Sequence, residues 1–333
     1  MNIAVLEGYV CNPGDLSWDG FERYGDVTVY KRTPRETLRE RMKGVEIVIA
    51  TKVIWDKEAL DWSPDLKLVA LASTGYNVVD LDEARRRGIT VCNVPAYSTP
   101  DVAQMTIALM LELCLNVGKH TRQVLDGAWT RTHDFCFYAM PLIEVAGKTL
   151  GIVGMGSIGQ AVARIARAFD MEVLFASRSP KPHLETPGVR QVKLDELLRR
   201  SDVVSLHVPA TPQTERMIDA AALSQMKDGA LLINTARGTL VDERAVADAL
   251  RSGKLAGFGA DVVAVEPMRP DNPLLEVRDL NVAITPHIAW STKEARAVIT
   301  KTSAATTIAA MMAIQPPHSA FENADIFCTV SCP

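Results

Sequence analysis

The segment "TLGIVGMGSIGQAVARIARAFD", residues 149–170, decides the fold. It carries the pattern G-x-G-x-x-G at Gly154, Gly156 and Gly159. The pattern follows an apolar run typical of a strand and opens a segment with apolar residues at helical spacing, so it predicts a strand, a tight turn and a helix. Such a helix start presents free N–H groups and a positive dipole end, which favours binding of a dinucleotide pyrophosphate. The alternative is that the glycines serve only the turn.

Short apolar runs alternate with helical patterns on both sides of this segment. Strand-like runs in the first hundred residues are "NIAVLEG", "VTVYKRT", "EIVIATK", "LKLVALAST" and "ITVCNVP". The second series comprises "TLGIVGMG", "MEVLFAS", "DVVSLHVP", "ALLINTA", "GFGADVV" and "NVAITPH". Alternation of strands and helices indicates parallel sheets covered by helices on both faces. We therefore predict an α/β protein with two doubly wound, Rossmann-like domains.

The two series are joined by residues 98–120, "STPDVAQMTIALMLELCLNVGKH". This segment predicts one long helix that begins at Ser98 or Thr99 and has Pro100 in its first turn. Residues 126–148 follow with weak periodicity and several aromatic side chains. They are either an arm that packs on a second subunit or an ordinary connecting loop. Their length favours the arm, because long loops without regular structure usually have a function.

Composition excludes several classes of protein. The chain has 333 residues, 47% of them hydrophobic, and a formal net charge of -4. This charge gives no electrostatic basis for binding nucleic acid or an anionic membrane. The six cysteines are scattered, the N-terminus does not resemble a signal peptide, and the longest apolar run is too short to span a bilayer, so we expect a cytoplasmic protein. Cys328 and Cys332 have only His318 nearby as a third ligand, so no metal site is predicted.

The residues after the strand-like run "MEVLFAS" indicate which dinucleotide binds. An acidic residue there would bind the ribose 2'-hydroxyl of NAD(H). This chain has Ser177, Arg178 and Ser179, with Lys181 next and no carboxylate before Glu185. A hydroxyl and a guanidinium suit a 2'-phosphate, so NADP(H) is favoured. NAD(H) stays possible if Arg178 stacks on the adenine of either cofactor.

Four polar residues end or follow strand-like runs of the second series. Arg237 follows "ALLINTA", Asp261 lies in "GFGADVV" with Glu266 five residues later, and His287 follows "NVAITP". In a doubly wound sheet these positions share the edge that borders the ligand crevice. An arginine can bind a carboxylate with two hydrogen bonds, a histidine can transfer a proton to a keto oxygen, and a glutamate can fix the histidine tautomer. Taken singly, each could instead be an ordinary surface or capping residue.

These motifs together resemble the D-2-hydroxyacid dehydrogenase family. The matching segments are "GIVGMGSIG", "LINTARGTLVDERAVADAL", "GADVVAVEP" and "NVAITPHIAW", within a resemblance from about residue 45 to about residue 310. The resemblance makes Arg237, Glu266 and His287 the catalytic residues and Asp261 the residue that holds the nicotinamide amide. It also implies further cofactor-binding residues, namely Met155, Ser157 and Ile158 of the glycine loop, His207, Val208 and Pro209, and Thr235 and Ala236. Residues Lys52, Thr74 and Gly75 would bind the substrate together with Arg237 and His287.

The resemblance also implies how the domains are organised. A substrate-binding, flavodoxin-like domain would comprise residues 1–98 and 290–333. A nucleotide-binding domain, residues 99–289, would be inserted between these parts, with a dimerisation helix and arm at residues 100–145. The active site would lie in the cleft of this arrangement, and the protein would be a homodimer. The segment "IQPPHSAFENADIFCTVSCP" departs from the family pattern, in which the chain commonly returns with a short strand.

Within the family, "TGYNVVD", "NVPAYSTPDVAQ", "DFCFY", "EPMRPDNPLL" and "HIAW" resemble the glycerate dehydrogenase (hydroxypyruvate reductase) branch. The expected reaction is hydride transfer between NAD(P)H and a small 2-keto acid, converting hydroxypyruvate to D-glycerate and also glyoxylate to glycolate. The alternatives are another family enzyme, of the phosphoglycerate, D-lactate or hydroxyphenylpyruvate type, or a nucleotide-sensing corepressor or scaffold on the same fold. The substrate loop lacks the extra basic residues that a phosphorylated substrate would require.

Overall fold

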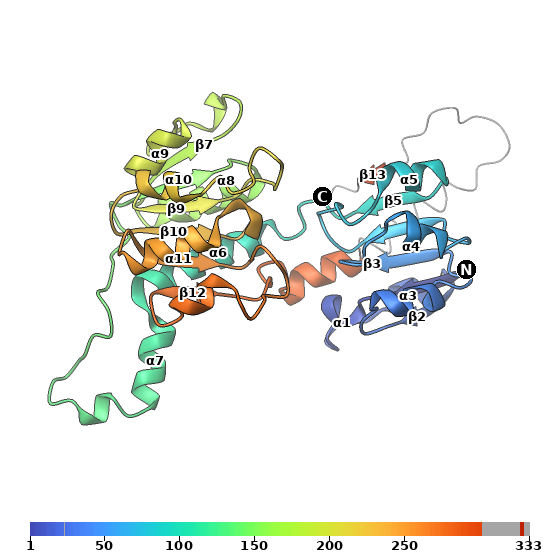
Figure 1. The fold of residues 1–333 in the computed structure, drawn as a ribbon, viewed down its shortest axis with the longest axis horizontal. Coiled ribbons are helices and arrows are strands. Elements are labelled where there is room, and N and C mark those ends of the chain that lie inside the picture. The colour runs from blue at the N-terminus through green and yellow to red at the C-terminus, as the bar shows by residue number, and fades with distance from the viewer. Residues whose placement is uncertain (23, 302–326, 330–333) are drawn as a thin grey trace. The chain divides into compact units, whose positions relative to one another are not determined.

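The structure is a computed structural model that describes residues 1–22, 24–301 and 327–329 (Figure 1). The chain divides into two compact units. Unit 1 consists of Met1–Ser98 and Ser291–Pro333, and unit 2 of Thr99–Trp290. Cys332 and His318 lie outside the described residues.

Unit 1 is built on a six-stranded parallel sheet in the order β13-β5-β4-β3-β1-β2. The strands are β1 (Asn2–Val5), β2 (Asp26–Val29), β3 (Ile47–Ala50), β4 (Leu68–Leu71), β5 (Thr90–Asn93) and β13 (Phe327–Thr329). The helices are α1 (Gly8–Cys11), α2 (Asp19–Glu22), α3 (Arg35–Arg41), α4 (Lys57–Asp61) and α5 (Leu81–Arg86). Every residue of β3 and β4 is buried, as expected for central strands that are covered on both faces. The order β2-β1-β3-β4-β5 is that of a flavodoxin-like fold.

Residues after Ser291 complete unit 1. The guanidinium of Arg296 forms an ion pair with Asp15 through two hydrogen bonds of 2.7 Å. The backbone of Phe327–Thr329 pairs in parallel with β5. The C-terminal segment that departs from the family pattern in sequence therefore contains a short strand within the described residues.

Unit 2 contains a seven-stranded parallel sheet in the order β12-β11-β10-β9-β6-β7-β8. Its strands are β6 (Thr149–Val153), β7 (Glu172–Ala176), β8 (Val189–Gln191), β9 (Val203–Leu206), β10 (Ala230–Asn234), β11 (Leu255–Ala260) and β12 (Val282–Ile284). The α-helices are α6 (Thr99–Leu115), α7 (Val117–Leu125), α8 (Ser157–Ala168), α9 (Leu194–Arg200), α10 (Ala220–Gln225) and α11 (Glu243–Arg251). Short 3-10 helices are η1 (Trp129–Arg131), η2 (Pro182–Leu184), η3 (Gly238–Leu240) and η4 (Pro273–Val277).

The strand order of unit 2 reverses between β6 and β9, which is where a doubly wound sheet opens its ligand crevice. Helices α6 and α8 bury apolar residues against one side of the sheet, including Met110, Leu113 and Val162. Helices α9, α10 and α11 cover the other side. The predicted fold class, two parallel-sheet α/β domains, is confirmed.

The predicted long helix is confirmed over Thr99–Leu115, but it does not continue to residue 120. Helix α6 ends at Leu115, and α7 starts at Val117 with an axis bent by 57°. Asn116 between them is left-handed, with φ of 49°, a conformation that asparagine tolerates better than most residues. Within the described residues no single helix is long and apolar enough to cross a membrane, and α6 and α7 satisfy that test only as this bent pair.

Helix α7 and residues 126–148 extend from unit 2 as an arm, which we define as residues 117–148 (Figure 1). Helix α7 buries none of its residues within the chain. Several large apolar side chains of the arm are exposed, namely Val117, Leu125, Trp129, Phe135, Tyr138 and Leu142. The exposed fraction reaches 80% for Leu125 and 89% for Phe135, so these side chains lack the cover that a core would give them.

Candidate active site

The glycine loop at the carboxyl end of β6 has the geometry that a pyrophosphate requires. Gly154 has a φ of +104°, and a side chain there would collide with the carbonyl of His207. Gly159 packs so closely that a Cβ atom would lie 2.3 Å from the carbonyl oxygen of Gly154. A Cβ atom at Gly156 would meet nothing within 4 Å, and no side chain caps the N-terminus of α8. The loop therefore offers open space and free N–H groups to a phosphate, which fits a bound dinucleotide.

His287 and Glu266 form a hydrogen-bonded pair at the same edge of the sheet. The Nδ1 atom of His287, which follows β12, lies 2.6 Å from the Oε2 atom of Glu266, which follows β11. Their side chains are 24% and 31% exposed, so the pair is partly screened from water but accessible. Because the glutamate engages Nδ1, the Nε2 atom of the ring is left to give or accept a proton.

Arg237 lies on the adjacent loop, directly after β10. The exposed side chain is anchored by one hydrogen bond of 2.7 Å from Nη1 to the carbonyl of Ala236. The next residue, Gly238, contacts the loop that carries Glu266 so closely that a Cβ atom there would lie 1.9 Å from the backbone carbon of Val263. The absence of a side chain at Gly238 thus allows the loops after β10 and β11 to pack backbone to backbone.

Asp261 braces the loop that carries His287. The residue is 1% exposed. Its carboxylate accepts hydrogen bonds from the Thr285 hydroxyl at 2.6 Å and from the N–H groups of Ile288 and Ala289 at 2.8 Å. Burial raises the pKa of Asp261 above its usual range, whereas these hydrogen-bond donors and the nearby His287 lower the pKa by a smaller amount. His287 has a φ of +57°, a strained conformation for a residue other than glycine. The sequence did not reveal this bracing role, because only the fold brings Asp261 and residues 285–289 together.

The predicted cofactor-lining residues lie at the carboxyl ends of β9 and β10. His207, Val208 and Pro209 follow β9, where the backbone of His207 packs on Gly154. Burial lowers the pKa of His207 to about 4, so its ring is neutral at physiological pH, and its Nε2 atom lies 2.9 Å from the Ser205 hydroxyl. Thr235 and Ala236 follow β10, but the Thr235 hydroxyl contacts Thr106 at 2.8 Å within the core. The Thr235 side chain thus links the end of β10 to α6.

The residues proposed to select the cofactor follow β7 at the same edge. Arg178 is exposed, and no contact of its guanidinium is found among the described residues. The Ser177 hydroxyl, in contrast, donates a hydrogen bond of 2.9 Å to the carbonyl of Ser179. Of the two side chains predicted to donate hydrogen bonds to the 2'-phosphate, only that of Arg178 makes no contact within the described part of the chain.

The predicted substrate-binding residues Lys52, Thr74 and Gly75 belong to unit 1, where they follow β3 and β4. The exposed Lys52 lies on a turn whose N–H groups, from residues 51–53, donate to the carboxylate of Glu7 at 2.6 to 3.1 Å. The Thr74 hydroxyl donates to the carbonyl of Val94 at 3.0 Å, and Asn93 donates to the Thr74 carbonyl at 2.8 Å. Both loops thus have a defined backbone at the carboxyl edge of their own sheet.

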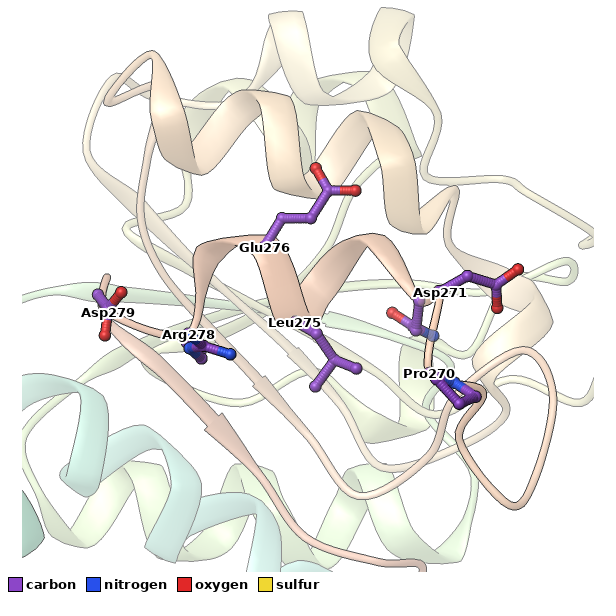
Figure 2. A pocket seen from close by; sticks show the side chains of 7 residues that line it. Pro270, Asp271, Leu275, Glu276, Arg278 and Asp279 are labelled. Atoms are coloured by element: carbon purple, nitrogen blue, oxygen red, sulfur yellow. The ribbon is translucent and has the colours of Figure 1, made fainter.

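A separate hollow of about 330 Å³ lies over η4 and is lined by Pro270, Asp271, Asn272, Leu275, Glu276, Arg278 and Asp279 (Figure 2). Figure 2 shows the Glu276 carboxylate directed away from Leu275 and toward the neighbouring helix. That carboxylate is held by Arg244 and Arg251 of α11. None of the predicted site residues lines this hollow.

The fold and the site of unit 2 define a class of protein. A doubly wound sheet, a glycine loop open to phosphate and a histidine paired with a glutamate at one sheet edge are typical of an NAD(P)-dependent dehydrogenase. Residues 107–289 match the sequence model of the D-isomer specific 2-hydroxyacid dehydrogenase, NAD binding domain. The chain belongs to this family of oxidoreductases.

Individual relatives are similar over most of their length. A hydroxypyruvate reductase from Blautia hydrogenotrophica is 45% identical over 299 residues, which cover 89% of this chain and 92% of that protein. A glycerate dehydrogenase from Methylorubrum extorquens is 42% identical over 267 residues, which cover 80% and 82%. Among solved structures, an acyclic imino acid reductase in complex with NADPH and D-Arg is 30% identical and superposes with a TM-score of 0.79 over 95% of this chain and 98% of that one.

Proposed function

We propose that this protein reduces hydroxypyruvate to D-glycerate, and glyoxylate to glycolate, by hydride transfer from a nicotinamide cofactor. The observation that carries the proposal is the 2.6 Å hydrogen bond between His287 and Glu266 at the sheet edge that also carries the glycine loop. The names of the two relatives above support hydroxypyruvate as the substrate.

The chain's own residues account for the proton and for the substrate carboxylate. The cofactor, when bound, supplies the hydride that reduces the keto carbon. His287, as the imidazolium, gives its Nε2 proton to the keto oxygen, and the neutral ring takes the proton back in the reverse reaction. Glu266 fixes the ring through Nδ1 and stabilises its positive charge. Arg237 pairs with the substrate carboxylate, which a planar guanidinium can do with two parallel hydrogen bonds.

NADP(H) is the proposed cofactor, with NAD(H) as the alternative. Arg178 supports this choice because it presents an unengaged guanidinium after β7, and the first carboxylate beyond it along the chain is Glu185. A guanidinium pairs strongly with a phosphate, whereas a carboxylate at this place would repel it. The NADPH bound by the imino acid reductase named above agrees with this proposal.

We also propose that the protein is a cytoplasmic homodimer. The exposed apolar side chains of the arm, such as Leu125 and Phe135, support a partner surface. The six cysteines are scattered along the sequence and form no C-x-x-C pair, a pattern typical of proteins in a reducing compartment.

Initial rates with hydroxypyruvate, glyoxylate, pyruvate and phenylpyruvate, each with NADPH and with NADH, test the proposal. Fast turnover of hydroxypyruvate to the D-isomer is expected, and His287→Ala should lower kcat by about 10²-fold or more. Arg237→Ala should raise KM for the keto acid, whereas the matched control Arg278→Ala, at the hollow over η4, should leave it unchanged. A clear preference for pyruvate or phenylpyruvate would contradict the substrate assignment, and turnover without His287 would contradict the proton donor.

A further inference from the structure

The loop after β7, residues 177–181, is folded around one side chain from the neighbouring strand. Gln191 is the last residue of β8 and lies beside the loop. Its Oε1 atom accepts a hydrogen bond of 2.6 Å from the N–H of Lys181. Its Nε2 atom donates to the Ser177 hydroxyl at 3.0 Å and to the carbonyl of Ser179 at 3.1 Å. The amide thus holds residues on both sides of Arg178.

The loop is also tied to the phosphate-binding turn. The Lys181 ammonium donates a hydrogen bond of 3.1 Å to the carbonyl of Met155, the residue between the first two glycines of the motif. Gly154, at the start of that turn, donates its N–H to the carbonyl of Ala176 at 2.9 Å. Because Lys181 is held by Gln191, the Gln191 amide sets the position of the loop relative to the turn that receives the pyrophosphate.

The same residue engages the nearest acidic group along the chain. The backbone N–H of Gln191 donates to the Oε1 atom of Glu185 at 2.9 Å. The loop itself contains no carboxylate, and its Ser177 hydroxyl proton is used by Ser179. The Lys181 ammonium already donates to the carbonyl of Met155, whereas the guanidinium of Arg178 makes no contact among the described residues and offers all its donors to a dianionic phosphate. The residues on either side of Arg178 are held by Gln191.

We propose that Gln191 is a positioning residue that determines cofactor specificity: its amide fixes the 177–181 loop so that Arg178 binds the 2'-phosphate of NADPH. The inference rests on the proposed function, in which Arg178 is the phosphate ligand. Gln191 itself makes no contact with the cofactor in this scheme. Its amide holds the loop in one conformation before the phosphate binds, so the loop loses less conformational entropy on binding.

The variant Gln191→Leu tests the inference, because it removes the three side-chain hydrogen bonds at similar side-chain size. Steady-state rates with NADPH and NADH at saturating hydroxypyruvate are compared for wild type, Gln191→Leu, Arg178→Ala and the double variant. The control is Gln225→Leu, an exposed glutamine on α10. For Gln191→Leu we expect kcat/KM with NADPH to fall about tenfold through KM, with kcat kept and the NADH value changed less than about twofold.

The double variant separates positioning from a general structural effect. If Gln191 acts through Arg178, adding Gln191→Leu to Arg178→Ala causes no further loss with NADPH, so the two changes are not additive. Equal losses with both cofactors, or additive losses in the double variant, would overturn the inference. The ratio of NADPH to NADH efficiency in the wild type tests the proposed function, and the change of that ratio in Gln191→Leu tests the inference, so the two can fail separately.

A second variant, Gln191→Glu, tests the inference if Gln191→Leu folds poorly. Gln191→Glu keeps an acceptor for the Lys181 N–H but loses both donors and adds a negative charge beside the phosphate position. The preference for NADPH should fall more steeply than in Gln191→Leu, by well over tenfold. An unchanged ratio in Gln191→Glu would overturn the inference as firmly as it would in Gln191→Leu.

Discussion

Replacing Asp261 by alanine should lower both the stability of unit 2 and the rate of reaction. The substitution removes the acceptor for three hydrogen bonds of 2.6 to 2.8 Å, one of them from the buried N–H of Ala289. An orphaned buried donor costs about 1–3 kcal/mol. Part of this loss is offset, because the buried carboxylate itself is costly to ionise, as its raised pKa indicates. We therefore expect a net loss of about 2–4 kcal/mol.

The rate should fall because the same carboxylate braces the strained backbone of His287. A left-handed residue other than glycine stores about 1–3 kcal/mol, which the loop can release by moving once the brace is gone. A displacement of about 1 Å can cost about 10²-fold in kcat.

Thermal melting and steady-state kinetics measure the two effects of Asp261→Ala. A loss of this size corresponds to a fall in Tm of about 5–10 °C for a domain of this size. The control is Asp228→Ala, which removes an exposed aspartate paired with Lys254 and should change Tm by about 2 °C at most. If Asp261→Ala melted like Asp228→Ala and kept its kcat, the bracing role would be refuted.

Three further predictions concern other parts of unit 2. In Gly159→Ala the new Cβ atom would lie 2.3 Å from the Gly154 carbonyl oxygen, so α8 must shift. The affinity for NADPH, measured by fluorescence titration, should therefore fall at least about tenfold. An unchanged affinity would contradict the close packing. Glu266→Gln should lower kcat by about 10²-fold without weakening cofactor binding, and an unaltered kcat would show that His287 needs no charged partner. The Glu276 carboxylate has its pKa lowered to about 2 by Arg244 and Arg251, so its stabilising effect is present above pH 4.5 and is lost as pH falls toward 2. The Tm deficit of Glu276→Gln should accordingly be largest near neutral pH and disappear in acid, and a deficit that grew in acid would reverse the argument.

The sequence predicted those features that local patterns encode. Apolar runs located the central strands, and the glycine motif located the turn before α8, because both depend on residues close together in the chain. The edge strand β8 escaped prediction because its three residues, Val189–Gln191, include only one buried apolar side chain. The break at Asn116 escaped prediction because the apolar run over residues 105–117 continues across it, and one left-handed asparagine leaves little trace in such a pattern.

The sequence predicted only part of the candidate site. The pairing of Glu266 with His287 was expected from their positions after neighbouring strands, and the structure brings them together. The bracing by Asp261 was not, because a buried aspartate near a strand end suggests a ligand as readily as a structural acceptor. The roles of Gln191 and Lys181 depend on side-chain contacts between two loops, which spacing along the chain does not report.

Unit 1 is built from two parts of the chain that are separated by unit 2, so it can complete its fold only late in synthesis. The Asp15–Arg296 ion pair joins residues separated by 281 positions, so it cannot form until the ribosome has made all of unit 2. Within unit 2, the entry helix α6 and the exit segment after β12 meet where the Thr285 hydroxyl approaches the Met105 sulfur at 4.0 Å. Folding of unit 2 therefore brings the two halves of unit 1 to a common point and shortens the loop that must close between them. A nascent chain arrested before residue 296 would carry a complete nucleotide-binding unit beside an unfinished one.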